Sequence, residues 1–516
     1  MRRLYITTPI YYPSGKPHIG HAYTTTLADV IARYKKLIGC DVFFLTGMDE
    51  HGQKIEEAAK KANVSPQKFV DDIALVFKDL WKRLDIDYQG FIRTTSPIHE
   101  KVVQEVFEQF LNDGYLYLDK WKGLYCVSCE ENYTLTQATK KEDGKLYCRV
   151  GHQLSEKEEE SYFFKMSKYE NWIKDLYANN QSLIYPISRV HELTNSFLNE
   201  GLTDLSVSRT SLTWGIPVIS NPKHKIYVWI DALLNYLTAL GYKTSDDSLF
   251  KKYWHDEQCE VVHLMSKEIT RFHCIYWPIM LKCLNLRLPS KVISHGWIIT
   301  DQGKMSKSLG NVIDPIAYIE EFGPDALRYY LMAEISIEKD GVFTRESFIN
   351  VYNNDLANIY GNLVSRFLGM TSKYTNNIVC KANKPFTKPQ QAIVDLIKST
   401  IASVHNFIDA YDIKEVLAAT KHLACEVNKL IQDAKPWTLF ANKETEELNN
   451  LLFIVANAIR VITTLLQPIL TNATKIICDQ MNFKPTDILW DNLLEFDILN
   501  NHKVNGSTPI FLRKEK

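Results

Sequence analysis

The stretch LYITTPIYYPSGKPHIGH, at residues 4–21, constrains the fold of this chain more than any other. Its first five residues are apolar, aromatic or β-branched, which predicts a buried strand. Three prolines and a glycine then interrupt regular structure, and apolar residues recur at helical spacing from Leu27 to Ile38. The stretch therefore predicts a strand that passes through a tight loop into the N-terminus of a helix.

His18, Gly20 and His21 fall at that predicted helix N-terminus. The unpaired amides and the positive end of the helix dipole favour a phosphate there. Gly20 lets a ligand approach the backbone, and the two imidazoles add donors. Two structural histidines that flank a glycine would give the same pattern, so this loop alone does not decide between the two interpretations.

A second segment, Lys304-Met305-Ser306-Lys307-Ser308, carries two cations and two hydroxyls. Nucleotidyl transfer needs donors on the α-phosphate and cations on the departing pyrophosphate, without a covalent nucleophile. The pair HIGH and KMSKS is the signature of class I aminoacyl-tRNA synthetases, which this chain resembles.

The order of predicted elements indicates an α/β fold with a parallel, doubly wound sheet. Strands are expected at 41–46, 226–230, 260–264 and 291–294, with helices near 65–84 and 97–112. Ligands of such sheets lie beyond the strand carboxyl ends, where Asp49-Glu50-His51-Gly52 would emerge. A carboxylate there would suit an ammonium group, although a polar loop with a capping aspartate is the simpler alternative.

Residues from about 116 interrupt this alternation with Cys126, Cys129, Cys148 and His152. Three thiolates and an imidazole at this spacing favour a structural zinc knuckle, and buried free thiols are the alternative. A closed site of this kind would not be catalytic. The insertion is small for a hydrolytic editing domain, so we expect none.

The last third of the chain predicts helices. Asn358, Asn362 and Arg366 recur at i, i+4 and i+8, which is either a solvated face or a stripe that reads bases. Trp437 follows Pro436 and could stack on an unpaired base or belong to the core. We expect a linker turn at 376–389 and a frayed tail at 511–516.

Net charge, cysteine content and hydropathy limit the function classes that this chain can belong to. The formal net charge of −1 provides no bulk attraction to nucleic acid, so RNA contacts must come from local patches. Ten cysteines without a signal peptide predict a reducing, cytoplasmic location. We saw no apolar run near the ~20 residues of a membrane span and expect no membrane partner.

Together these segments resemble the methionyl-tRNA synthetase family, of the shorter bacterial type, from about residue 4 to 470. The motifs are PIYYPSGKPHIGHAYT, FFLTGMDEHGQK, YCVSCEENYT, YVWIDALLNY, RFHCIYWPIML and GKMSKSLGNVIDP. The resemblance implies a split Rossmann-like sheet with a zinc-knuckle insertion domain and an all-α helical-bundle anticodon-binding domain. The expected divisions are the first catalytic half (1–115), the insertion (116–224), the second catalytic half (225–300), the KMSKS and stem-contact region (301–348), and the anticodon-binding domain with its tail (349–516).

The resemblance also implies roles for individual residues. His18, His21, Lys304 and Lys307 would be catalytic. ATP would contact His18, Gly20, His21, Lys267, Glu268, His295, Gly296, Trp297, Lys304, Met305, Ser306, Lys307 and Ser308. Methionine would contact Ile10, Tyr12, Asp49, Trp229, Ala232, Leu233, Tyr236, Ile269 and His273. The anticodon would contact Asn358, Asn362, Arg366 and Trp437, and zinc would bind Cys126, Cys129, Cys148 and His152.

Four positions depart from the family pattern. Glu268 stands where the family usually has aspartate, Ser266 replaces a glycine, and Leu233 stands where some members have proline. The spacing from Cys148 to His152 is one residue longer than the family pattern, so the departure affects the position of His152 as a ligand.

The expected partners are ATP with Mg²⁺, L-methionine, and initiator and elongator tRNA(Met), with the protein acting as a monomer. Three rivals stay open at this point. They are another class I enzyme such as a cysteinyl-tRNA synthetase, a nucleotidyltransferase that does not act on tRNA, and an inactive tRNA-binding module.

Overall fold

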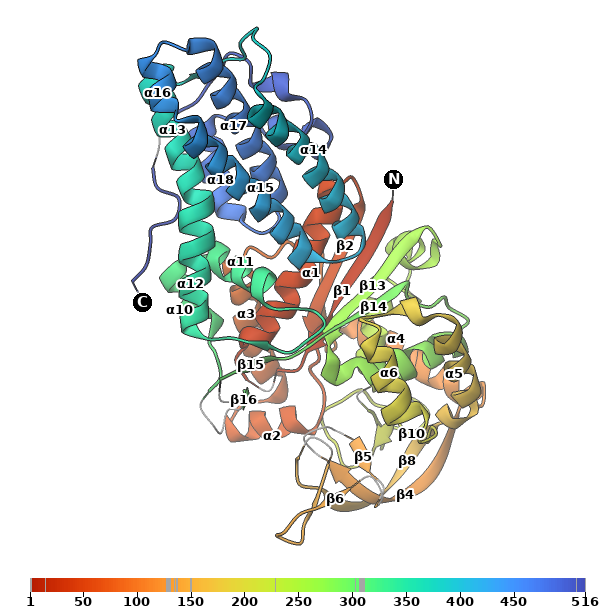
Figure 1. Cartoon of the computed structure of the whole chain (residues 1–516). Coiled ribbons are helices and arrows are strands. Elements are labelled where there is room, and N and C mark those ends of the chain that lie inside the picture. Colours follow the sequence, from red (N-terminus) through yellow and green to blue (C-terminus); the bar gives the residue numbers. More distant parts are fainter. Residues whose placement is uncertain are drawn as a thin grey trace.

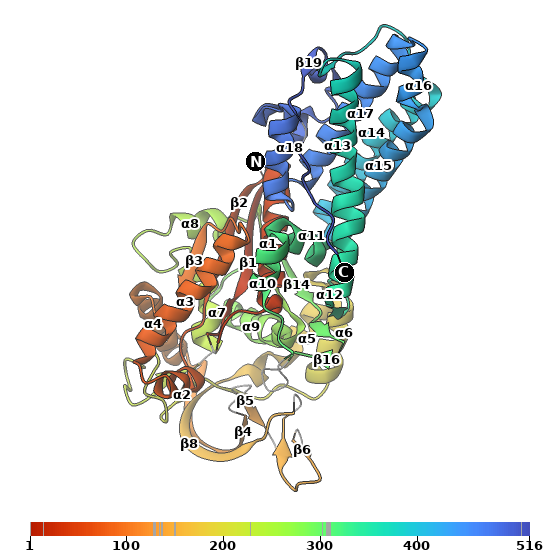
Figure 2. The same ribbon diagram turned by 90° about the vertical axis from the view of Figure 1, so that its left-hand side faces the viewer.

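A computed structural model describes residues 2–515 except 14, 127–130, 134, 136–137, 149–150, 228, 302, 306–310 and 507, and leaves the side chains at 121, 131, 132, 157 and 304 undescribed. Three parts are visible in it: a central sheet with its helices, an insertion on one side, and a helical bundle on the other (Figure 1). The turned view shows the bundle rising from the sheet and the insertion lying at the opposite end (Figure 2).

The central sheet has the strand order β3-β2-β1-β13-β14-β9 among the described residues, and every neighbouring pair is parallel. Its strands are β1 (Arg3–Tyr11), β2 (Asp41–Met48), β3 (Gly90–Arg93), β9 (Ile184–Tyr185), β13 (Cys259–Ser266) and β14 (Lys291–His295). The predicted parallel-sheet α/β core is therefore confirmed. Strands β1 and β13 lie side by side although the insertion separates them in the sequence.

Helices cover both faces of this sheet because its central strands are apolar on both sides. Leu4 and Ile6 of β1 pack into the core on one face, while Tyr5 packs into the core on the other. The first face is covered by α1 (Ile19–Leu37) and α3 (Pro66–Arg83), and the second by α4 (Pro97–Asn112), α7 (Trp229–Thr238) and α9 (Trp277–Cys283).

The insertion is built on an antiparallel sheet of β10 (Leu205–Ser206), β8 (Ser155–Phe164), β4 (Leu116–Cys126) and β5 (Glu131–Tyr133). The short pairs β6 (Thr139–Lys140) with β7 (Leu146–Tyr147) and β11 (Ser208–Arg209) with β12 (Lys225–Ile226) accompany it, as do α5 (Glu170–Asn179) and α6 (Ser188–Leu193). Strand β9 belongs to residues 116–224 in sequence, yet it pairs with β14. The insertion thus returns to the edge of the central sheet.

One predicted strand, at 226–230, is wrong. Among the described residues of this segment, Lys225–Ile226 forms β12, and α7 begins at Trp229. Trp229, Ala232, Leu233 and Tyr236 recur at helical spacing, so the helix starts two residues earlier than the strand prediction allowed. Helix α2 (Gln53–Lys61) was not predicted, because it is only 9 residues long and buries only Ile55 and Ala59.

The carboxyl-terminal part is helical, as predicted. Its helices are α10 (Pro315–Phe322), α11 (Pro324–Glu334), α12 (Arg345–Val351), α13 (Asn362–Tyr374), α14 (Lys388–Asp409), α15 (Ile413–Ala434), α16 (Pro436–Ala441), α17 (Thr445–Leu466) and α18 (Thr471–Met481), and a π-helical segment, Tyr352–Gly361, joins α12 to α13. Small strands complete the fold: β15 (Ile298–Thr300), β16 (Gly303–Lys304), β17 (Gly341–Val342), β18 (Ile378–Val379) and β19 (His502–Lys503). Short helical turns are α8 (Ser248–Phe250), Met166–Tyr169, Gln181–Leu183, Thr194–Leu198, Lys251–His255, Lys267–Ile269, Phe272–Tyr276, Pro485–Ile488, Trp490–Asn492 and Phe496–Leu499.

Helix α17 is the core of the bundle. By length and composition it could cross a membrane, since it has 22 residues and contains an 18-residue apolar window with a mean hydropathy of 1.5, contrary to the expectation of no such run. However, 94% of that apolar window is buried inside the protein, where α13, α14, α15 and α18 surround it. The position of α17 in the core of the bundle therefore explains its apolar composition.

The predicted frayed tail is also wrong. The Asn353 side chain donates to the Lys514 carbonyl oxygen (2.8 Å) and accepts from the Lys514 amide (2.9 Å). The ring of Phe511 lies 6.1 Å from that of Tyr352. The tail runs back from the bundle to this junction. No local pattern predicts this contact, because the partners are 161 positions apart.

A fully buried ion pair joins the sheet to the bundle. Arg328 of α11 donates to Asp29 of α1 at 2.7 Å, and both side chains are 0% exposed. The same guanidinium donates to the carbonyls of Leu84, Pro468 and Ile469. These acceptors come from the end of α3 and from the segment after α17, so one side chain connects α1, α3, α11 and the bundle.

We expect Arg328→Met to lower the free energy of unfolding by about 3 kcal/mol or more, because the buried carbonyls of Leu84, Pro468 and Ile469 lose their shared donor. Asp29 keeps Arg33 as an ion-pair partner. Urea unfolding monitored by circular dichroism measures this. The matched control is Arg345→Met, since Arg345 pairs with Glu321 in an exposed setting and such pairs contribute little. Equal small losses in the two variants would contradict the structural role of Arg328.

Candidate active site

The HIGH loop folds at the N-terminus of α1, as predicted. His18 is the N-cap residue, and its Nδ1 accepts from the Gly20 amide at 3.1 Å. The His21 Nδ1 accepts from the His18 amide at 3.1 Å. Because Nδ1 is the acceptor in both neutral rings, the ring proton of each is on Nε2. The two rings lie 3.9 Å apart, so the loop presents two N–H donors at a helix N-terminus.

Gly20 is required by this geometry. A Cβ atom at this position would lie 2.9 Å from Cε1 of His18. Any other residue would therefore push the His18 ring away from the amide that it caps.

His295, at the end of β14, faces the same loop. Its Nε2 lies 2.8 Å from Oγ1 of Thr24, one turn into α1. Its Nδ1 lies 2.7 Å from the Gly296 carbonyl oxygen and so carries the proton. Burial lowers the pKa of His295 to about 4, which keeps this ring neutral. Thr24 was not predicted, and nothing in the sequence pairs it with His295.

Asp49 follows β2 at the carboxyl edge of the sheet, where ligands of parallel sheets bind. Its amide donates to the Tyr11 carbonyl oxygen at 3.0 Å, which keeps the end of β2 against the end of β1. Ile10 and Tyr12 lie on that neighbouring strand end and in the loop that follows it. The sheet thus brings Asp49 beside the first two predicted pocket residues.

Helix α7 and the turn Lys267–Ile269 with Phe272–Tyr276 contribute the rest of the predicted pocket. The Tyr236 hydroxyl donates to Nε2 of His273 (2.7 Å), and Nδ1–H of His273 donates to the Ile269 carbonyl (3.0 Å). Burial lowers the pKa of His273 to about 4. Ala232 and Leu233 are buried on the same helix.

Trp229 stacks on Phe272, with ring centroids 3.5 Å apart. Phe272 was not predicted, although its place between Ile269 and His273 is a usable signal. This aromatic pair lies where the sequence predicts one wall of the pocket.

The predicted nucleotide residues after β13 and β14 also lie together. Lys267 pairs with Asp340 at 2.8 Å, and its ammonium lies 4.2 Å from the ring of Trp297. Asp340 accepts from the Trp297 amide as well. A Cβ at Gly296 would lie 2.4 Å from the Lys339 carbonyl, so glycine permits this close approach. Glu268 is exposed beside Lys267.

Much of the KMSKS segment lies outside the described residues, namely Ser306, Lys307 and Ser308, as does the side chain of Lys304. The Lys304 backbone belongs to β16, which pairs with β15, and Met305 is half-buried against the main core. Strand β15 follows directly from His295–Trp297, so the segment begins next to the nucleotide residues.

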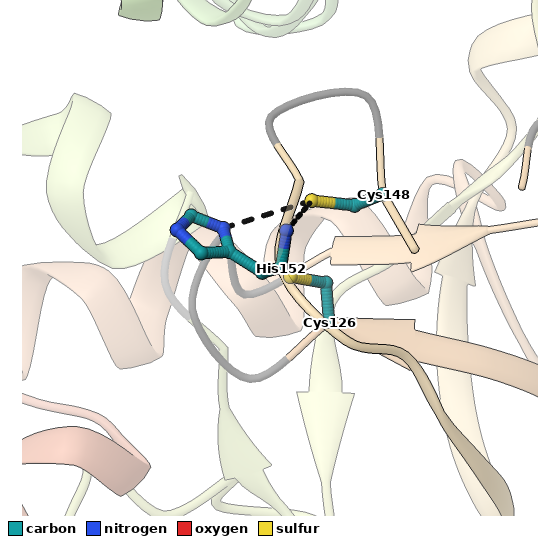
Figure 3. A group of neighbouring side chains, drawn as sticks. All are labelled: Cys126, Cys148 and His152. Atoms are coloured by element: carbon teal, nitrogen blue, oxygen red, sulfur yellow. Dashed lines mark hydrogen bonds between the residues drawn. The ribbon is translucent and has the colours of Figure 1, made fainter. Parts of the chain in front are cut away.

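A candidate metal centre lies in the insertion. Ligand atoms of Cys126, Cys148 and His152 all lie within 4.8 Å of one another. The His152 amide donates to Sγ of Cys148 at 3.2 Å, and Nδ1 of His152 lies 3.6 Å from that sulfur (Figure 3). Cys129, the fourth predicted ligand, is outside the described residues. Two thiols and an imidazole are donors that suit zinc.

The predicted base-reading residues lie on the bundle, far along the chain from the sheet. Asn358 and Asn362 are exposed, and Arg366 is half-buried with its guanidinium 3.5 Å from the Asn428 side chain. Trp437 is 51% exposed on α16, so the alternative that it belongs to the core is wrong. Lys435, in a left-handed conformation (φ 47°), turns the chain between α15 and α16.

Comparisons with known protein families give two matches. Residues 4–368 match the family described as tRNA synthetases class I (M). Residues 381–504 match the family described as the anticodon binding domain of methionyl tRNA ligase.

Relatives match over nearly the whole chain. The methionine–tRNA ligase of Ureaplasma parvum is 52% identical over 512 residues, covering 99% of this chain and 98% of that protein. The Bacillus subtilis methionine–tRNA ligase is 44% identical and covers 99% of this chain and 78% of that protein. A structure of Mycobacterium tuberculosis methionyl-tRNA synthetase in complex with methionyl-adenylate superposes with a TM-score of 0.94 at 33% identity, covering 99% of this chain and 100% of that one.

The neutral state of His295 predicts a pH dependence of stability. The unfolded chain binds this proton near pH 6.5, but the folded protein does so only near pH 4. Between these values the unfolded state holds more protons, so the free energy of unfolding falls as the pH falls.

We expect His295→Asn to reduce this loss by up to about 1.4 kcal/mol per pH unit, because asparagine keeps a donor for the Gly296 carbonyl but does not titrate. Urea unfolding at pH 7 and pH 4.5 measures the difference. His191→Asn, at an exposed position, is the control. The same acid loss in wild type and His295→Asn would show that His295 is not the group responsible.

Proposed function

The chain belongs to the class I methionyl-tRNA synthetases, and from this we propose that it activates L-methionine with ATP and transfers it to tRNA(Met). The observation that carries the proposal is the arrangement at the carboxyl edge of the central sheet. There the N-terminus of α1 with His18 and His21 lies beside the loop with Asp49 and the wall formed by α7.

The reaction has two steps. In the first, a carboxylate oxygen of methionine attacks the α-phosphorus of ATP, a new P–O bond forms, and the bond to the β-phosphate oxygen breaks to release pyrophosphate. In the second, a hydroxyl of the terminal tRNA ribose attacks the methionyl carbonyl, its proton is lost, and AMP leaves. Neither step needs a covalent enzyme intermediate, so the protein contributes positioning and charge.

ATP would bind along the HIGH loop and the residues that follow β13 and β14. The Nε2–H donors of His18 and His21 suit phosphoryl oxygens as their charge increases. Lys304 and Lys307 would neutralise the departing pyrophosphate. Lys267, Glu268 and the His295–Trp297 segment would hold the nucleoside, with Glu268 as the carboxylate near the ribose. Mg²⁺ would enter bound to the ATP phosphates.

Methionine would lie between Asp49 and the pocket wall, with Asp49 on its ammonium. A thioether favours polarisable aromatic contacts, each worth ~0.3–1.5 kcal/mol. Tyr12, Trp229 and Tyr236 supply such rings. The neutral His273, held by Tyr236, lines the pocket without adding a charge. One methylene is worth only ~1–3 kcal/mol, so homocysteine would be rejected imperfectly.

Zinc would be bound by Cys126, Cys129, Cys148 and His152. The compact placement of the three described ligands supports this. A site with four protein ligands has no position for substrate, so its role would be to stabilise the insertion.

The bundle would read the anticodon of tRNA(Met), through the exposed amides of Asn358 and Asn362, Arg366 and the exposed ring of Trp437. Stacked bases and base-edge hydrogen bonds are how proteins read single-stranded RNA. Both initiator and elongator tRNA carry this anticodon, so one surface would serve both. We propose that the enzyme acts as a monomer in the cytoplasm.

The direct test is ATP–pyrophosphate exchange across the twenty amino acids, where we expect methionine alone to be an efficient substrate. Asp49→Asn should raise the methionine KM by roughly ten- to a hundredfold, because an ammonium loses its charged partner at a desolvated site. Asp246→Asn, at an exposed carboxylate, is the control. If des-amino analogues lost as much affinity as methionine, Asp49 would not be the ammonium partner.

Zinc should be present at one atom per chain in protein purified without chelators, by elemental analysis. Cys126→Ser and Cys148→Ser should lose it and lower the thermal midpoint, because metal binding is coupled to folding of the knuckle. Cys478→Ser, at a half-buried cysteine in the bundle, should retain it. Full zinc content in the first two variants would refute the ligand set.

Trp437→Ala should lower aminoacylation roughly ten- to a hundredfold and leave exchange unchanged, because a stacked base is worth ~1–3 kcal/mol and exchange needs no tRNA. Phe440→Ala is the matched control. Phe440 is 48% exposed on the same helix, but its ring already packs 4.8 Å from that of Tyr374. Equal loss of charging and exchange would rule out an anticodon role for Trp437.

A further inference from the structure

A buried carboxylate connects three elements that surround the methionine pocket. Asp231, in the first turn of α7, is 0% exposed. Its Oδ2 lies 2.7 Å from Nδ1 of His51, and its Oδ1 lies 2.7 Å from Nε2 of His99. His51 belongs to the loop after β2, and His99 belongs to α4. Both carboxylate oxygens of Asp231 are therefore used to hold an imidazole.

The second nitrogen of His99 continues the network. Its Nδ1 lies 2.7 Å from Oγ1 of Thr238, at the far end of α7. His99 thus contacts α7 at Asp231 and again at Thr238, two turns later. This fixes both the position of α7 against α4 and its rotation about its own axis.

The network lies between the two sides of the pocket. On α7, Asp231 lies between Trp229 and Ala232, which we assign to the wall. On the loop, His51 is two residues beyond Asp49, and the Asp49 charge contributes to raising the pKa values of both His51 and Tyr236. A displacement of Asp231 would therefore change the separation between the carboxylate and the wall.

The rest of this loop is held from other directions. The Glu50 amide donates to Thr94 (2.8 Å), and the Glu50 carbonyl accepts from the indole of Trp214 (2.7 Å). The Glu50 carboxylate pairs with Arg93 at 2.8 Å. These contacts fix the loop to β3 and to the insertion. The contact between Asp231 and His51 fixes the same loop to α7.

Burying the charges of this network costs desolvation free energy, which a purely structural role would not require. Burial alone would keep His51 neutral, but the Asp231 carboxylate raises its pKa, and the His51 imidazolium in turn lowers that of Asp231. Glu100 of α4, 3.6 Å from Nε2 of His51, adds a second carboxylate. Buried ion pairs of this kind often contribute less stability than apolar residues of the same volume. The directional hydrogen bonds of these pairs fix the positions of the side chains, which apolar packing would not do to the same accuracy.

We propose that Asp231, acting through His51 and His99, is a positioning residue that sets the distance between Asp49 and the α7 wall and thereby determines the affinity for the ammonium of methionine. The inference rests on the proposed function, because it requires Asp49 to bind that ammonium. None of the three network residues needs to touch the substrate.

Paired substitutions at the two histidines test this without disturbing Asp231. His51→Asn places an amide nitrogen where Nδ1 stood and preserves the contact with Asp231, whereas His51→Gln reaches past it. At His99 the order reverses, because glutamine places its nitrogen at the Nε2 position and asparagine does not. Asp231→Asn is the third change, and His191→Gln is the surface control.

The measurements are the KM values for methionine and ATP in pyrophosphate exchange and the thermal midpoint. Inhibition constants for methioninol, which keeps the ammonium, and for 4-(methylsulfanyl)butanoate, which lacks it, complete the set. We expect His51→Gln, His99→Asn and Asp231→Asn to raise the methionine KM and the methioninol constant at least tenfold. The ATP KM and the butanoate constant should stay within about threefold, and His51→Asn and His99→Gln should show much smaller changes than their partners.

Other outcomes would overturn the proposal. If the disruptive variants lowered the thermal midpoint and kcat with an unchanged methionine KM, the network would be structural only. Equal weakening of methioninol and butanoate would mean a general pocket defect. If Asp231→Asn fails to fold, the paired variants at His51 and at His99 still test the proposal. Absence of methionine-dependent exchange in the unsubstituted enzyme would instead overturn the proposed function, and this inference with it.

Discussion

The pair between Asp29 and Arg328 is the contact on which the arrangement of the whole molecule depends. Asp29 lies on α1, the helix that starts at the HIGH loop, and Arg328 lies on α11 with the carbonyls after α17 as further acceptors. Removing Asp29 would leave the Arg328 guanidinium buried without its carboxylate, whereas removing Arg328 would leave Asp29 paired with Arg33 and the carbonyls without their donor. The orientation of the bundle, and so the distance from its Trp437 surface to the HIGH loop, is set through this point.

Two electrostatic environments exist at the same edge of the sheet. Toward the nucleotide residues, burial keeps His295 neutral, and His273 in the pocket wall is neutral for the same reason. Beside Asp49, by contrast, Asp231 keeps His51 charged. Both ring nitrogens of His295 and of His273 are engaged within the protein. These neutral rings therefore hold their neighbours in place, while the charge beside Asp49 is held in the Asp231–His51 pair.

The helices and strands that depend on a short-range pattern of residues could be predicted from the sequence. The periodicity from Leu27 to Ile38 identified α1, and apolar runs identified β2, β13 and β14 to within a few residues. The parallel sheet followed from their order. Nothing local, however, indicated that Ile184–Tyr185 would leave the insertion to pair with β14, because two residues carry no periodicity.

Errors arose where a pattern was ambiguous or a partner distant. The apolar run at Ile226–Ile230 fits a strand or the start of a helix, and tertiary packing decided for the helix from Trp229 onward. The tail was mispredicted because Asn353 is remote in sequence from Lys514. Among site residues, the predicted strand ends and helix N-terminus indicated His18 and Asp49, and the resemblance supplied their specific roles. Their partners Thr24 and Asp340 became visible only in the folded chain.

The position of β1 in the sheet has a consequence for protein synthesis. Thr7 pairs in register with His263, 256 positions later in the chain. At roughly 5–20 residues per second, a ribosome needs on the order of 10–50 s to supply that neighbour. During this interval the nascent β1 has β2 on one side and an open, apolar edge on the other, and such edges template association between chains. A central strand of the finished enzyme is thus, for about half of translation, an open edge that a chaperone could protect.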